Sequence, residues 1–112
     1  IGYPWSENLF VLMTNHKKMY CDLAMTFARP TWLAWNMVVA KEYGVIDRVM
    51  FASDYVAHGY DYFSENPTED LKRWINFVKV GLNEVCEKAG WPTFTEKEIN
   101  GILYDNAARL YL

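Results

Sequence analysis

The chain of 112 residues is long enough for one domain with one hydrophobic core. Its 52% hydrophobic and 17% aromatic content excludes a disordered chain. The net charge of -3 gives no reason to expect nucleic acid or an anionic membrane as a partner, and no apolar run is long enough to span a bilayer. The two cysteines, Cys21 and Cys86, do not form a CxxC pair, which predicts buried reduced thiols in a cytoplasmic protein.

The first elements alternate between strand and helix patterns. Residues 1–3 are typical of the end of a strand, and Ser6 is placed to cap a helix. The side chains expected on one face of that helix follow helical spacing: Leu9, Leu12, Met13 and His16. Residues 19–25 alternate as a strand does, with Cys21 on one face and Asp22 on the other.

The middle of the chain continues this alternation. Thr31 is a plausible N-cap for a largely apolar helix over about residues 32–43, which Gly44 is placed to end in a left-handed cap. Residues 48–53 form a short apolar run between a charged start and a polar end, which predicts a strand buried on both faces.

The last third is predicted to be helical. Residues 66–69, Asn-Pro-Thr-Glu, are a strong helix start, and Gly90 ends that helix. Thr95 with Glu98 forms a capping box for a further helix. The order β-α-β-α-β-α-α predicts an α/β fold with parallel strands and right-handed crossovers. The chain shows no internal domain boundary.

Asp54 follows the most apolar predicted strand. In parallel α/β folds, ligands and catalytic groups lie at the carboxyl ends of the strands, so this carboxylate is the main candidate for function. The local pattern alone is equally compatible with an Asp that forms a turn after a core strand.

Three segments resemble the C-terminal part of the amidohydrolase-related family, in the branch that includes aminocarboxymuconate semialdehyde decarboxylase. They are residues 2–5 (Gly-Tyr-Pro-Trp), 47–55 (Asp-Arg-Val-Met-Phe-Ala-Ser-Asp-Tyr) and 106–111 (Asn-Ala-Ala-Arg-Leu-Tyr). The resemblance implies the end of a (β/α)8 TIM barrel, about strands six to eight with their helices, over residues 1–112. A complete barrel has roughly 250 residues. One departure is Val56, where the family usually has Pro.

The same resemblance implies a divalent metal, with Zn favoured over Mn, at the mouth of the barrel. Asp54 is the implied metal ligand and proton shuttle, and a metal-activated water would attack or protonate a small carboxylate, amide or lactone substrate. The family's H-x-H pair and its fifth-strand His have no counterpart in this sequence, and a further His would fall directly before Ile1. The remaining ligands are therefore expected from upstream residues or from another chain.

Several other residues are weaker candidates for the site. His58 lies in the loop after Asp54 and could contact substrate, although a solvated loop histidine is the commoner case. Arg29 is a candidate for binding a substrate carboxylate, or else an exposed loop cation. Asp22 is expected to face the barrel interior and to be paired or hydrogen-bonded there, either in support of the mouth or, as we favour, as a structural group. The aromatic side chains expected either to line a pocket or to cover the barrel end are Tyr55, Tyr60, Tyr62 and Phe63.

Two alternatives to a hydrolase stay open. A non-oxidative decarboxylase is compatible with the same scaffold. A small α/β module without catalysis, which associates with a second copy to cover its sheet edges, is also compatible with the sequence. The first residue is Ile1 rather than Met and is typical of a strand end, so the chain is expected to begin within something larger, unless the terminus has been processed or engineered.

Overall fold

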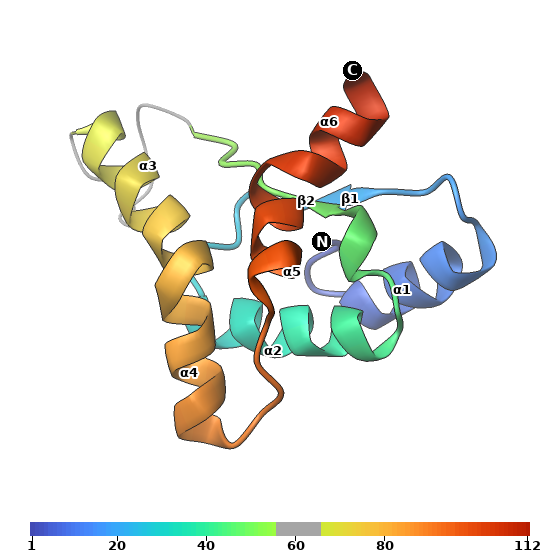
Figure 1. Ribbon diagram of the computed structural model, residues 1–112, viewed down its shortest axis with the longest axis horizontal. Coiled ribbons are helices and arrows are strands. Elements are labelled where there is room, and N and C mark those ends of the chain that lie inside the picture. Colours follow the sequence, from blue (N-terminus) through green and yellow to red (C-terminus); the bar gives the residue numbers. More distant parts are fainter. Residues whose placement is uncertain (56–65) are drawn as a thin grey trace.

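A two-stranded parallel sheet lies among helices in the computed structural model, which describes residues 1–55 and 66–112 (Figure 1). The strands are β1 (Cys21–Asp22) and β2 (Val49–Met50). The α-helices, in chain order, are α1 (Ser6–Asn15), α2 (Pro30–Glu42), α3 (Pro67–Asn76), α4 (Leu82–Ala89), α5 (Glu96–Asn100) and α6 (Asn106–Tyr111). The predicted mixed α/β class and the parallel direction of the strands are confirmed.

Both strands are shorter than their sequence patterns predicted. Residues 1–3 do not form a strand, although the amino group of Ile1 donates a hydrogen bond to the carbonyl of Asp22 and so lies beside β1. On the opposite edge of β2, the Phe51 N–H donates to the Ile102 carbonyl at 2.7 Å. Strand geometry is sustained by hydrogen bonds to neighbouring strands, and each of these two strands has one strand partner among the described residues.

The long helical segment of residues 67–89 begins and ends as predicted. The Asn66 side chain accepts hydrogen bonds from the N–H groups of Thr68 and Glu69, and Gly90 closes the segment with φ 71°. A π-helical turn at Phe77–Gly81 separates α3 from α4. A second such turn, at Gly101–Asp105, lies between α5 and α6. Neither wide turn was predicted.

The starts of α1 and α2 differ from the prediction by one or two residues. Trp5 and Arg29 are the N-cap residues, whereas Ser6 and Thr31 lie inside the helices. Pro30 at the first position has no N–H to satisfy, so α2 can begin before Thr31.

The buried face of α1 is also rotated from the one predicted. Phe10 and Met13 are fully buried, whereas Leu12 is 47% exposed, because the helix packs on α2 through its Phe10 side.

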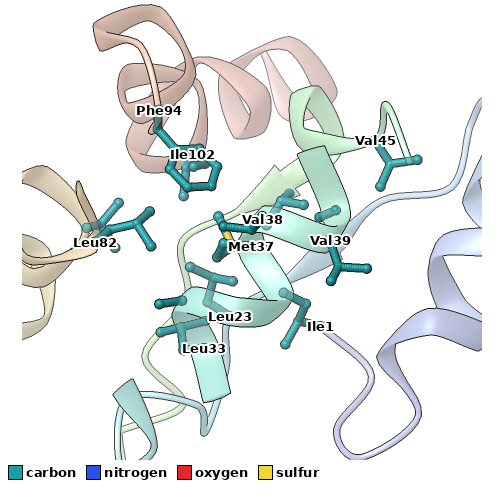
Figure 2. Close-up of a cluster of buried hydrophobic side chains, with 14 of the residues drawn as sticks. Ile1, Leu23, Leu33, Met37, Val38, Val39, Val45, Leu82, Phe94 and Ile102 are labelled. Carbon is teal, nitrogen blue, oxygen red and sulfur yellow. The ribbon is translucent and has the colours of Figure 1, made fainter. Parts of the chain in front are cut away.

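The core forms where α2 packs between the sheet and the other helices. Figure 2 shows Leu33, Met37 and Val38 of α2 close to Leu23, which follows β1, and to Ile102 from the second π turn. Leu82 and Phe94 close the side toward α4.

The two cysteines have the state predicted from sequence. Cys21 and Cys86 are buried free thiols. Burial, partly offset by the positive terminal amino group, raises the pKa of Cys21 to about 11, so this thiol is unreactive at neutral pH. No helix among residues 1–55 and 66–112 is long and apolar enough to cross a membrane.

Candidate active site at the carboxyl ends of the strands

Asp54 lies just beyond the carboxyl end of β2, as predicted. Its side chain is exposed, and its backbone is left-handed with φ 47°. Few residues other than Gly adopt this conformation, and Asp is among those that tolerate it best. The turn after β2 therefore presents a carboxylate to solvent at the edge of the sheet where ligands bind in parallel α/β folds.

Tyr55 packs against α3, which lies on the side of the sheet toward which β1 points (Figure 1). Its ring packs 5.9 Å from that of Trp74, measured between centroids. Loss of water around the phenol, together with the negative charge and hydrogen bond of Asp70, raises the pKa of Tyr55. Asp70 is 1% exposed and forms an ion pair with Arg73 at 2.8 Å.

An aromatic cluster joins the two strand ends to α3. Phe27 follows β1 and Phe51 follows β2, and their ring centroids are 5.5 Å apart. Trp74 stacks on Phe27 at 5.3 Å and is 3% exposed. Tyr55 borders this cluster through its contact with Trp74, and its expected role in lining a pocket or covering the barrel end stays a prediction.

Arg29 lies over an aromatic ring at the start of α2. The guanidinium carbon is 4.7 Å from the centre of the Tyr3 ring, and that ring meets Trp32 edge-on at 4.9 Å. Arg29 is exposed, and no carboxylate of the described residues pairs with it. A guanidinium that lies over an aromatic ring can still offer N–H groups to a planar anion.

Asp22 does not face an enclosed interior. Its side chain is exposed, and Oδ1 accepts a hydrogen bond from the Ala24 N–H at 3.0 Å, which forms a local turn after β1. The prediction that Asp22 is paired or hydrogen-bonded is met by this contact, whereas the side chain is exposed and no element of the described chain encloses it.

The opposite, amino-terminal edge of the strands is densely hydrogen-bonded. Arg48 is 5% exposed, and its Nη1 donates to the carbonyls of Met13 at 2.7 Å and His16 at 3.1 Å. His16 is the C-cap of α1. Asn106 Nδ2 donates to the Val49 carbonyl at 2.8 Å. These contacts make Arg48 and Asn106 structural.

Two hollows in the surface lie away from Asp54. One of about 360 Å³ is at the amino-terminal edge, where Asn106 and Arg109 take part in the hydrogen bonds of the fold. Another of about 460 Å³ lies between the starts of α1 and α2 and is lined by Trp5, Trp32 and Trp35. We place the candidate site at Asp54 rather than at either hollow, because its exposed carboxylate lies at the ligand-binding edge of the strands.

A metal centre would need several donor side chains close together. In the described part of the chain, no three side chains of His, Cys, Asp or Glu converge as a metal group would need. The exposed carboxylate of Asp54 is a hard oxygen donor of the kind that Zn or Mn accepts, but a catalytic zinc normally takes three protein ligands. The described residues thus offer one suitable ligand and not a complete centre.

Some predicted site residues fall outside the described residues. These are His58, Tyr60, Tyr62 and Phe63. Conversely, sequence analysis did not identify Tyr3 or Asp70. Asp70 stands four residues before Trp74 on one face of α3, and this spacing was the available signal that it points inward.

Comparison with known proteins identifies the family. A family model described as Amidohydrolase matches residues 1–112, the whole chain. No curated protein and no solved structure matched the chain. The full-length match shows that the chain belongs to the amidohydrolase family, whose members are generally enzymes and typically use a divalent metal.

Proposed function

From membership of the amidohydrolase family and the position of Asp54, we propose that this chain is the C-terminal part of a metal-dependent hydrolase of the amidohydrolase-related superfamily. Asp54 would be one metal ligand and would also take up the proton released during the reaction. The observation that carries the proposal is the exposed carboxylate at the carboxyl end of β2. The branch related to aminocarboxymuconate semialdehyde decarboxylase is proposed on the sequence segments alone.

The divalent metal, with Zn favoured, would lower the pKa of a bound water and so supply a nucleophile near neutral pH. The chain's own contribution is to hold the Asp54 carboxylate at the strand end and to leave it free of ion pairs with the described residues. The other ligands would come from residues upstream of Ile1 or from another chain.

The substrate would carry a carboxylate or a similar planar anion. Arg29 supports this, because its guanidinium is exposed on the Tyr3 ring without a carboxylate partner in the described part of the chain. A substrate carboxylate bound there is compatible with hydrolysis and equally with non-oxidative decarboxylation, which mass spectrometry of the product would distinguish by loss of CO₂. His58 is retained as a weaker candidate for contact with substrate.

The coding sequence upstream of Ile1 is the first test. A His codon directly before Ile1 and an H-x-H pair far upstream would support the proposal. An initiator Met at that position would support instead a non-catalytic module that associates with a second copy.

The biochemical test compares the two carboxylates at the ends of strand β2. Asp54→Asn in the protein as encoded should weaken Zn²⁺ binding by at least about tenfold, because even groups that only support metal ligands change affinity by this much. Asn also tolerates the left-handed backbone, so the turn should be kept. The matched control is Asp47→Asn at the amino-terminal end of the same strand, where the side chain is 66% exposed. Equal Zn²⁺ affinity in both variants would contradict the proposal.

A further inference from the structure

The hollow of about 460 Å³ between the starts of α1 and α2 has the size of a small-molecule pocket. Three indole rings line it: Trp5 from the turn before α1, and Trp32 and Trp35 from α2. Trp5 is 70% exposed and Trp35 is 45% exposed, so these rings are open to contact from outside the chain. They offer a flat apolar surface on which an aromatic ring can pack.

Ser6, the first residue of α1, also lines this hollow and is only 2% exposed. Its Oγ has no hydrogen-bond partner among residues 1–55 and 66–112. A hydroxyl removed from water without a partner lowers the stability of the fold, and alanine at the same position would avoid that cost. A polar ligand atom in the hollow would supply the missing partner.

The amino terminus of α1 adds hydrogen-bond donors at the same place. Its N-cap is Trp5, and no side chain of the described residues caps this ten-residue helix. The first N–H groups of a helix have no partner within the helix, and the helix dipole favours negative charge beside them. The hollow therefore combines donors for an anion with rings for an apolar group.

The charge at the hollow indicates which kind of anion it can accept. Glu7 is the one charged side chain among the described residues that line it, and Glu7 is exposed. A carboxylate nearby repels a doubly charged anion more strongly than a singly charged one. The tryptophan rings also favour a ligand with a flat apolar part over a small inorganic anion.

We propose that this hollow binds an aromatic monocarboxylate. The ligand ring packs against the tryptophan side chains, and its carboxylate accepts hydrogen bonds from the Ser6 hydroxyl and from the first N–H groups of α1. This site is separate from Asp54 and does not depend on the proposed function.

Titration with benzoate is the direct test, followed by tryptophan fluorescence in the protein as encoded. We expect a dissociation constant of about 1 mM or lower, as a small ligand with one charged group gives. Benzyl alcohol, which keeps the ring without the charge, should bind at least about tenfold more weakly. Equal affinity for the two compounds would overturn the inference, and so would the absence of benzoate binding up to about 20 mM.

Ser6→Ala separates ligand binding from stability. Benzoate affinity should fall about three- to tenfold, because one hydrogen bond is lost. The free energy of unfolding of the unliganded protein should stay the same or rise, because the removed hydroxyl has no partner within the described residues. Thr14→Ala is the control on the last turn of α1, where the hydroxyl donates to the Phe10 carbonyl at 2.9 Å, and it should leave benzoate affinity unchanged. Unchanged benzoate affinity in Ser6→Ala would overturn the inference.

Trp5→Ala tests the aromatic wall. Because Trp5 is largely exposed, the fold should be kept, while benzoate affinity should fall about tenfold. Tyr104→Ala is the matched control, since Tyr104 is 63% exposed on the second π turn, far along the chain from the hollow. Equal benzoate affinity in these two variants would contradict a site at the hollow.

Arg29→Gln distinguishes this site from the position proposed for a substrate carboxylate. If benzoate binds in the hollow, Arg29→Gln should keep its affinity within about threefold, because Arg29 does not line the hollow. Loss of benzoate binding in Arg29→Gln together with unchanged binding in Ser6→Ala would place the ligand at Arg29 and overturn the inference. The proposed function is tested separately by Zn²⁺ binding to Asp54→Asn, so either proposal can fail without the other.

Discussion

The two ends of the short parallel sheet differ in how their polar groups are used. At the amino-terminal edge, buried Arg48 and Asn106 donate hydrogen bonds to backbone carbonyls from α1 and β2. At the carboxyl edge, each strand is followed by a residue with positive φ, Met25 at 62° and Asp54 at 47°. Asp54 is exposed there, and it has no ion pair within the described residues.

The difference separates stability from function along one strand. Polar groups that are fully hydrogen-bonded and buried stabilise the fold and cannot serve a ligand. Strained and exposed groups contribute little to the fold and are available for chemistry. This division, with stability at the amino-terminal face and chemistry at the carboxyl face, is the one expected for parallel α/β enzymes. Substitutions at the two edges should therefore differ in kind and in size.

Arg48→Met should have the largest effect on stability. It removes hydrogen bonds from a charged donor and leaves the carbonyls of Met13 and His16 without their buried partner. We expect a loss of about 3 kcal/mol in the free energy of unfolding, measured in urea. Lys72→Met is the control, because the Lys72–Glu69 pair is exposed and should contribute less than about 1 kcal/mol. If Arg48→Met lowered the free energy of unfolding no more than Lys72→Met does, the contrast between the two edges would not hold.

At the same edge, the ion pair between Glu98 and Lys41 should make a smaller contribution to stability, and this contribution should depend on pH. Burial alone would raise the pKa of Glu98, but the hydrogen bond from the Thr95 backbone and the Lys41 ammonium outweigh it and lower the pKa below its ordinary value of 4.5. Because the folded pKa is the lower one, the stabilisation is fully present above about pH 4.5 and is lost as the pH falls through the folded value.

Glu98→Gln tests this dependence. It should cost less than about 1 kcal/mol at pH 7, since the partners are partly exposed. Urea unfolding at a series of pH values should show the gap between the two proteins closing below pH 4.5. A gap that is constant with pH would show that charge plays no part in this contact.

Asp54→Gly should have the smallest effect on stability. Glycine adopts φ 47° without strain, while its greater freedom in the unfolded chain opposes the gain, so we expect a change within about 0.5 kcal/mol. Urea unfolding measures it alongside Arg48→Met. A loss above about 1 kcal/mol would mean that the Asp54 side chain stabilises the fold, which would place it with Arg48 rather than with the site.

Sequence patterns predicted a helix boundary correctly where the contact that fixes the boundary lies within a few residues of it. The Asn66 cap, the Thr95–Glu98 capping box and the left-handed Gly90 are all present in the structure. The same rules misplaced the starts of α1 and α2, because Trp5 and Arg29 are N-caps without a side-chain hydrogen bond that a sequence pattern could reveal. Strand lengths were overestimated, because pairing depends on neighbours that are distant in sequence.

By itself, the sequence determined the mixed α/β class with parallel strands, the caps at Asn66, Gly90 and Thr95, the buried thiols and the place of Asp54 after a buried strand. These follow from the spacing of apolar residues, from turn-forming residues and from short sequence motifs, which are local properties of the chain. Only the tertiary structure decided that Asp22 is exposed, that Asp70 is buried, and that the Tyr55 ring packs against Trp74. Those outcomes depend on contacts between segments far apart in sequence, whose energies no local pattern encodes.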